Sequence, residues 1–144
     1  MPAQKVYNSD EVEVIFGPVI MEGYADGEFL TIEQESDDID DVVGTDGEVA
    51  VSRTNDRRAT ATVKLLQTSN TNDLLSAIHL LGLNSPGMAG GIHPFVVKDR
   101  NGRTLIEGAN AWIKKAPDRS FDKTATSCEW VIRIAQIARF DGGN

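Results

Sequence analysis

The sequence predicts a mainly β protein with one short α-helix, in which a β-sandwich or barrel would bury the apolar sides of the strands. Several short runs alternate apolar and polar side chains, which is typical of strands with one solvated face. Asp26-Gly27 and Asn101-Gly102 stand between such runs, and both dipeptides favour tight hairpin turns. Only residues 71–82 change to helical spacing. Because the 144 residues show no internal repeat or boundary, we expect a single domain over residues 1–144.

The chain begins with strands. Residues 10–16 alternate, with two valines and a phenylalanine on one face and two glutamates on the other. Gly17-Pro18 ends this strand, and the Asp26-Gly27 turn leads into a second long strand at residues 28–35. The polar side of that second strand carries Thr31, Glu33 and Glu35.

Residues 36–48 hold five aspartates and one glutamate with little periodicity, and they are predicted to form a long exposed loop. A loop of this length inside a compact domain usually has a functional reason. A solvated acidic loop without a function stays open as the alternative. The spacing does not match a calcium-binding EF-hand, because Val42 and Val43 stand where a ligand and the turn glycine belong. A less regular calcium site stays open.

The middle of the chain is predicted to form a hairpin and then the helix. Residues 49–53 and 59–66 are expected to pair with each other, and the second run alternates Thr60, Thr62 and Lys64 with apolar residues. Ser69 or Thr71 can cap the helix that follows, and apolar residues recur at helical spacing up to Gly82, which is expected to end it.

The last third of the chain returns to strands. Residues 94–99 and 103–115 flank Asn101-Gly102 and are predicted to form a second hairpin. Residues 127–140 are predicted to form one strand that is largely apolar on both faces apart from its arginines. A strand of this kind lies at the centre of a sandwich or at a subunit interface.

Charge is divided unequally along the chain. Residues 1–50 hold fourteen acidic side chains and one basic side chain, a net charge of −13, while residues 51–144 hold eight acidic and thirteen basic side chains, a net charge of +5. A pI near 4.7 argues against sequence-reading contact with nucleic acid, which depends on clustered cations. An acidic part with a basic remainder suits a protein that stacks on copies of itself.

The sequence contains none of the motifs of common catalytic sites. It has no phosphate-binding loop, no nucleophile elbow and no His-Glu-x-x-His motif. Cys128 is the only cysteine, so we expect no internal disulfide and a buried thiol on a strand. With one cysteine, His79 and His93 are too few for the usual four-ligand zinc site. We expect no enzymatic activity, no cofactor, no metal site, no signal peptide and no membrane-spanning segment.

Five short blocks, in this order, carry a resemblance to a known family. They are Gly23-Tyr24-Ala25-Asp26-Gly27, Gly44-Thr45-Asp46-Gly47-Glu48, Leu65-Leu66-Gln67-Thr68-Ser69 with Asn72-Asp73 and Leu75-Ser76, Val97-Lys98-Asp99 with Gly102, and Glu129-Trp130-Val131-Ile132 with Gly142-Gly143. The chain resembles the small tail-tube proteins of contractile-tailed bacteriophages, a family of phage structural proteins formerly of unknown function. The resemblance covers almost the whole chain.

The resemblance implies two packed antiparallel sheets with one flanking helix, a fold shared with the tube proteins of type VI secretion. It also implies hexameric rings, whose sheets join into a continuous barrel around a channel and which stack into a tube inside a contractile sheath. The partners would be further copies of the chain, the sheath protein, and baseplate and tail-terminator proteins. The subunit would be made in the host cytoplasm and reside in the virion tail.

Two sets of residues are candidates for roles in such a tube. A channel lined with carboxylates repels DNA, which carries about one negative charge per 1.7 Å of axis, so DNA would pass without binding. The candidates for this lumen are Thr31, Glu33, Glu35, Thr60, Thr62 and Lys64; an outward face toward the sheath stays open for them. The candidates for contact between rings are Asp37, Asp38, Asp40, Asp41, Asp46 and Glu48 with Arg53, Arg57, Arg58, Arg100 and Arg103.

Two other functions stay open beside the phage tail tube. One is the tube protein of a related contractile secretion system or phage-like particle. The other is an acidic monomeric module that binds calcium or a protein partner. Ring formation separates the first two functions from the third, and calcium-dependent melting would favour the third.

Overall fold

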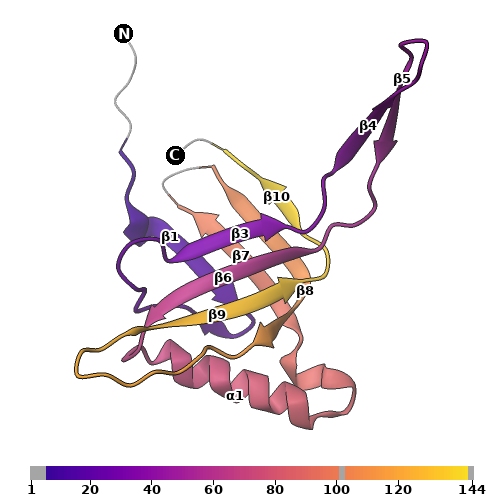
Figure 1. The fold of residues 1–144 in the computed structure, drawn as a ribbon. Coiled ribbons are helices and arrows are strands. Elements are labelled where there is room, and N and C mark those ends of the chain that lie inside the picture. Colours follow the sequence, from indigo (N-terminus) through magenta and orange to yellow (C-terminus); the bar gives the residue numbers. More distant parts are fainter. Residues whose placement is uncertain (1–5, 101–102, 143–144) are drawn as a thin grey trace.

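The computed structural model describes residues 6–100 and 103–142, and it confirms a mainly β fold with one helix and two antiparallel sheets (Figure 1). The larger sheet has eight strands in the order β2-β1-β7-β8-β9-β6-β3, with β10 paired to β8. It is not closed into a barrel, because β2 and β3 end the path. The strands of the larger sheet are β1 (Val12–Phe16), β2 (Val19–Ile20), β3 (Leu30–Gln34), β6 (Ala59–Leu66), β7 (His93–Asp99), β8 (Leu105–Lys115), β9 (Ser127–Ile134) and β10 (Ala138–Phe140).

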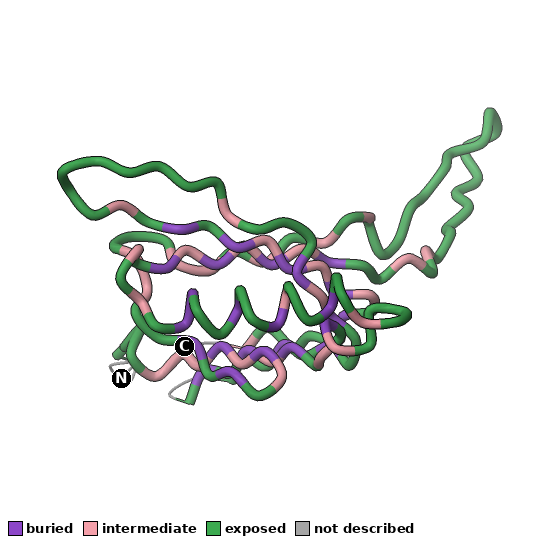
Figure 2. Tube along the Cα trace, turned by 90° about the horizontal axis from the view of Figure 1, so that it is seen from below, coloured by how far each residue is buried: buried purple, intermediate pink, exposed green. Residues whose placement is uncertain are grey.

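The larger sheet curls around its own apolar face, so that β3, β6 and β9 cross over β1 and β7 (Figure 1). The alternation expected at residues 10–16 is confirmed, because Val14 and Phe16 are buried. Strand β6 alternates in the same way, with every second side chain buried from Ala59 to Leu65. The buried residues lie between the layers and along the inner side of the helix (Figure 2). Cys128 and Trp130 belong to this core, as their places in a strand pattern predicted.

Helix α1 (Thr71–Asn84) confirms the predicted helix and continues two residues beyond Gly82. Gly82 serves close packing rather than termination, because a Cβ at this position would lie 2.8 Å from the Cα of Gly91 in the 3-10 segment η2 (Pro86–Gly91). At the other end, the Thr71 N–H donates to Ser69 Oγ at 3.2 Å, so Ser69 takes part in capping.

One buried side chain ties α1 to the sheet. The Asn72 amide nitrogen donates to the backbone oxygen of Leu66 at 2.9 Å, and its oxygen accepts a hydrogen bond from Trp130 Nε1 at 2.8 Å. Both side chains are almost fully buried. The start of the helix is therefore held against β9 by a polar contact inside the core.

Residues 37–48 are exposed as predicted, but the prediction that residues 36–48 form a loop is wrong. Strand β4 (Ile39–Val43) pairs with β5 (Val49–Arg53), and this second sheet projects from the body as a two-stranded arm (Figure 1). The Gly44 N–H bonds to the Glu48 oxygen at 2.7 Å, and Gly47 has φ +90°, which closes the turn between the strands. β-branched residues in both strands favour extended backbone despite the aspartates between them.

The pairing of residues 49–53 with 59–66 is wrong for the same reason. Strand β5 takes β4 as its partner, which leaves β6 between β3 and β9. The hairpin of residues 94–99 with 103–115 is confirmed by the antiparallel pairing of β7 and β8, and its turn residues 101–102 lie outside the described part of the chain.

The single strand predicted at residues 127–140 is divided in two. Strand β9 ends at Ile134, and β10 begins at Ala138 on the edge of β8. Between them, the Ala135 N–H bonds to Asn110 and the Ile137 N–H bonds to Arg57, so the chain leaves the β9 ladder. This break reverses the alternation, and Ile137 is buried while Ala138 and Phe140 are exposed.

We expect Asn72→Ala to lower the free energy of unfolding by about 1–3 kcal/mol, because it leaves the buried Trp130 N–H without its acceptor. The measurement is urea denaturation followed by tryptophan fluorescence. Asn84→Ala is the matched control, since Asn84 is exposed at the end of the same helix. An Asn72→Ala variant as stable as this control would contradict the role given to the buried contact.

Candidate functional site

The six residues predicted to line a channel lie together on the outward side of the curled sheet. Thr31 is paired with Thr62 across β3 and β6, and Glu33 is paired with Thr60. Strand β9 continues the surface, with Glu129 beside Lys64. We call this surface the polar face; it consists of Thr31, Glu33, Glu35, Thr60, Thr62, Lys64, Trp112, Lys114, Lys115, Glu129, Val131 and Arg133.

Glu35 is the centre of a small charge network on the polar face. It accepts a hydrogen bond from the Thr60 hydroxyl, and Arg133 Nη2 lies 3.7 Å from its carboxylate. The Thr60 hydrogen bond, followed by the charges of Arg133, Lys114 and Arg58, lowers the pKa of Glu35 below its ordinary value. The carboxylate is therefore held ionised and paired.

The polar face is nearly balanced in charge rather than strongly acidic. It carries three carboxylates and four cations, namely Glu33, Glu35, Glu129, Lys64, Lys114, Lys115 and Arg133. Sequence reasoning found the members on β3 and β6 and missed those on β8 and β9. The alternation within residues 127–134 already indicates that Glu129 and Arg133 lie opposite the apolar side of their strand. Only the strand order shows that this side belongs to the polar face.

The predicted inter-ring residues are divided between three places. All six carboxylates, from Asp37 to Glu48, are exposed on or beside the arm. Arg53 is on the arm itself, while Arg57 and Arg58 follow its base. Arg100 and Arg103 flank the turn between β7 and β8, where Arg100 lies 3.4 Å from Glu13. Of the predicted inter-ring acids and arginines, Asp38, Arg53 and Arg57 come together within one copy, at the base of the arm.

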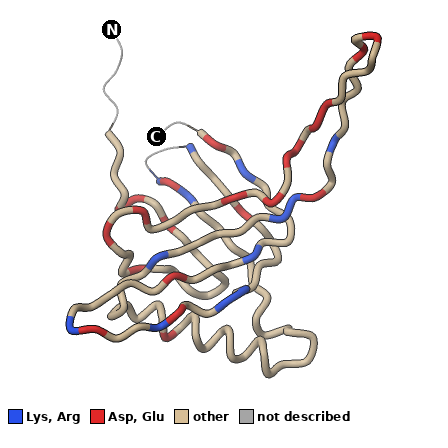
Figure 3. The backbone as a smooth tube through the Cα atoms, in the orientation of Figure 1, with Lys and Arg blue, Asp and Glu red and all other residues tan. Residues whose placement is uncertain are grey.

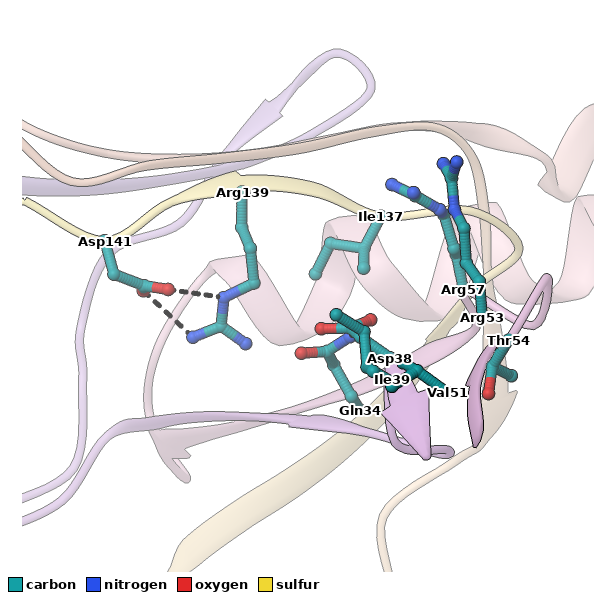
Figure 4. Close-up of a pocket in the computed structure, with 10 residues that line it drawn as sticks. All are labelled: Gln34, Asp38, Ile39, Val51, Arg53, Thr54, Arg57, Ile137, Arg139 and Asp141. Carbon is teal, nitrogen blue, oxygen red and sulfur yellow. Dashed lines mark hydrogen bonds and ion pairs between the residues drawn. The ribbon is translucent and has the colours of Figure 1, made fainter. Parts of the chain in front are cut away.

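A cleft of about 560 Å³ lies at the base of the arm (Figure 4). Arg53 and Arg57 lie side by side on one side of it, and Arg139 forms two hydrogen bonds of 2.9 Å with Asp141 on the other. Asp38 accepts a hydrogen bond from Gln34 at 3.1 Å within the cleft. Its remaining lining residues are Ile39, Val51, Thr54 and Ile137. The cleft combines cations with apolar side chains, which suits an acidic protein segment.

Arg58 is exposed and is paired within the same copy. Its Nε and Nη2 atoms each lie 2.9 Å from an oxygen of Asp56, and Asp56 also accepts from the Ser36 hydroxyl. The hydrogen bonds from Arg58, followed by the one from Ser36, hold the pKa of Asp56 far below its usual range. These bonds join Ser36 to Asp56 and Arg58 across the base of the arm.

His93 takes part in local packing between η2 and β1. His93 Nε2 is 3.0 Å from the Gly90 carbonyl, and its ring packs edge-on against Phe16. In residues 6–100 and 103–142, no three side chains of His, Cys, Asp or Glu come together as metal ligands would. Over the same residues, no helix is long and apolar enough to span a membrane.

Comparison with known sequences relates the chain to phage proteins. Residues 16–142 match the family described as bacteriophage PhiTE tail tube protein. The chain is also 29% identical over 122 residues to structural protein ORF10 of Pseudomonas phage KPP10, which covers 85% of this chain and 70% of that protein.

Solved structures with a similar fold come from contractile and phage-like particles. The sheath/tube terminator of the extracellular contractile injection system PVC has a TM-score of 0.62 at 12% identity, covering 97% of this chain and all of that one. The tube-terminating cap of the anti-feeding prophage has a TM-score of 0.58 at 7% identity, covering 97% and 94%. A chain of the gene transfer agent virion has a TM-score of 0.59 at 12% identity, covering 94% and 100%. At these identities the likeness shows a common fold.

We expect the Glu35→Gln variant to have a lower thermal midpoint than the unmodified protein near neutral pH. The difference between the two midpoints should narrow as the pH falls. A carboxyl with a lowered pKa in the folded state stabilises the fold above its unfolded pKa, and this contribution is lost as the pH falls through the folded pKa. The unfolded pKa of glutamate is about 4.3, so the narrowing begins below about pH 5. Thermal unfolding across this range measures it, with Glu33→Gln on the same face as the control. A difference that stays constant down to about pH 3 would contradict the network.

Proposed function

Because this chain belongs to the family of PhiTE tail tube proteins, we propose that it is a structural subunit that forms hexameric rings, which stack into a hollow tail tube. The tube lies inside a contractile sheath and conducts DNA, and the subunit performs no catalysis. Its other partners are the sheath, baseplate and tail-terminator proteins. It is made in the host cytoplasm and becomes part of the virion.

The observation that carries this proposal is the polar face together with the open edge beside it. Strand β3 ends the sheet path, so its outer edge has no strand partner within the described part of the chain. An exposed edge strand favours pairing with another chain, and closure into a ring removes all such edges. Joining the sheets of neighbouring copies would continue the polar face around a channel.

The charge on the polar face suits a conduit for DNA. Binding to DNA gains affinity from cations that are free to pair with phosphates. On this face Arg133 already lies near Glu35, and Lys64 stands opposite Glu129. We therefore propose a lumen that is nearly neutral rather than strongly acidic. Carboxylates lie beside its cations, so these cations do not retain DNA.

The arm supplies the proposed contact between rings. It projects from the body, and its carboxylates and apolar side chains are exposed in the single copy. Charge complementarity across a repeated interface fixes register and partner choice. The cations at the base of the arm and beside the β7–β8 turn are the first candidates to meet these acids in another copy.

We expect the purified protein to form rings or hollow tubes as its concentration rises. Negative-stain electron microscopy with light scattering on the same samples gives both the shape and the mass of the assembly. Hollow particles with a channel support the structural role. A monomer at every concentration, stabilised against heat by calcium, would contradict it and favour the binding module.

Reversal of Asp37, Asp38, Asp40 and Asp41 to lysine is expected to leave the subunit folded and to prevent stacking. The four side chains are exposed, so their replacement removes no core contact. Circular dichroism checks the fold and electron microscopy checks the assembly. The control reverses Asp10, Glu11, Glu22 and Asp26, which lie outside the arm. Normal tubes from the arm variant would contradict its role.

Glu33→Cys is expected to report which side of the sheet lines the channel. The native Cys128 is buried, so a thiol reagent is expected to react with the new cysteine. In tubes, a small maleimide should react and a large polyethylene-glycol maleimide should react much more slowly than with free subunits, because the channel excludes it. Equal reaction of tubes and free subunits with the large reagent would place the polar face outside the tube.

A further inference from the structure

The strands that carry the polar face end in two open edges. One is the outer edge of β3, which ends the sheet path. The other belongs to the last residues of β8. The pairing of β8 with β7 stops at Ala111 and His93, so Trp112–Lys115 pair only with β9 within the described part of the chain. In Figure 1, β3 lies above β6 and β9, and the end of β8 lies below them. The polar face is therefore open on both of its sides.

The two edges lie at the same level of the sheet and run in opposite directions. One row of paired residues crosses all four strands from β3 to β8, namely Ile32, Ala61, Ile132 and Ile113. The four strands alternate in direction, so β3 is antiparallel to β8. Copies related by rotation about a channel keep these directions. The β3 of one copy would therefore meet the β8 of the next as an antiparallel neighbour, as in the rest of the sheet.

The edge of β3 presents backbone groups to a further strand. In an antiparallel ladder, successive residues turn their N–H and C=O groups to one neighbour and then to the other. The Glu35 N–H bonds to the Arg58 oxygen at 3.1 Å, on the side of β6. The backbone groups of Leu30, Ile32 and Gln34 therefore point away from β6, toward the open edge.

The end of β8 presents its backbone in the same way. The Ala135 N–H bonds to the Asn110 oxygen at 3.0 Å, so Asn110 faces the β9 side of β8. By alternation, the backbone groups of Ile113 point to the side where β7 has already ended. Ile113 is the β8 member of the row that contains Ile32, so the outward backbone groups of the two edges lie at matching positions.

The apolar core is also open along β3. Leu30 and Ile32 pack against the core but are only partly buried. Together with Val97 and Ile106 they line a cleft of about 430 Å³. A strand beside β3 would cover these side chains and remove apolar surface from water. Such a strand would therefore extend the core as well as the backbone ladder.

The charges along the two edges are opposite. Residues 28–35 carry three carboxylates and no cation, whereas residues 112–119 carry three cations and one carboxylate. Figure 3 shows carboxylates along β3 and cations at the end of β8. Glu35 is paired with Arg133 of its own copy, which leaves Glu33 near the middle of the edge. Opposite charges favour the pairing of β3 with β8 over the pairing of two β3 edges.

We propose that the outer edge of β3 pairs antiparallel with Trp112–Lys115 of β8 in the next copy around the ring. We call this contact the seam. It rests on the proposed tube, for which it names the strand that receives β3. The other strand ends are shorter, because β2 has two residues and β10 has three, and they lie beside β1 and the start of β8. At the seam, Glu33 stands near Lys114 and Lys115 of the neighbouring copy, and the polar face continues from copy to copy.

Charge-swapped copies test the seam. Glu33→Lys makes the β3 edge basic, and Lys114→Glu with Lys115→Glu makes the β8 edge acidic. Each variant alone is expected to need an about tenfold higher concentration to assemble, because like charges then meet at every seam. When the two variants are mixed, copies that alternate around the ring meet with opposite charges at every seam. Assembly of the mixture should return to near the original concentration, as measured by light scattering.

The matched control is Glu129→Lys, which reverses a carboxylate on the polar face opposite Lys64, away from both edges. Mixed with the Lys114 and Lys115 variant, this control should not restore assembly as Glu33→Lys does. Equal restoration by the two lysine variants, or single variants that assemble like the original protein, would overturn the seam and leave the tube intact. An original protein that stays monomeric at every concentration would overturn the tube and the seam together.

The backbone part of the seam has its own test. Ile32→Pro removes an N–H that points out of β3, so it blocks the seam without removing a bond of the ladder with β6. Ile32→Ala is the matched control, because it shortens the same side chain and keeps the N–H. Circular dichroism and the thermal midpoint check that both variants fold. The proline variant is expected to need an about tenfold higher concentration to assemble than the alanine variant. Equal concentrations for two folded variants would overturn the seam, and the charge-swapped copies decide if the proline variant does not fold.

Discussion

The ladder between β6 and β9 is the constraint on which the rest of the structure depends. Its eight register pairs give both strands one alternation, so Ala61 and Ile132 face the core while Thr60 and Arg133 face out. A slip of one residue would exchange the two faces. The buried hydrogen bond between Trp130 and Asn72 fixes α1 to the same ladder. Core, polar face and helix position are therefore decided together.

The single copy leaves several surfaces incomplete, and this links its fold to the proposed assembly. The sheet ends at β3 without closing, the arm has no cover, and α1 exposes leucines outside its buried stripe. Each of these features is unfavourable in an isolated soluble protein. In the proposed tube, a repeating contact between copies would satisfy them without any change in the core.

The strand order decides on which surface of the protein each charged side chain lies. Six of the fourteen acidic side chains of the first fifty residues lie on or beside the arm, whereas the polar face draws its cations from β6, β8 and β9 and is nearly balanced. The same chain thus has an acidic projection and a nearly neutral sheet surface. A count of charges along the sequence finds the first property and misses the second.

The sequence by itself determined the strand-rich class, α1, the β7–β8 hairpin and the inward sides of β1 and β6, because alternation and turn residues act between near neighbours. It also identified the polar residues of β3 and β6. The tertiary structure decided that β5 turns to β4, that residues 127–140 divide in two, and that Glu129, Lys114 and Arg133 join the polar face. Strand partners are chosen by competition between segments far apart in the chain, through burial and backbone hydrogen bonds that no local pattern contains.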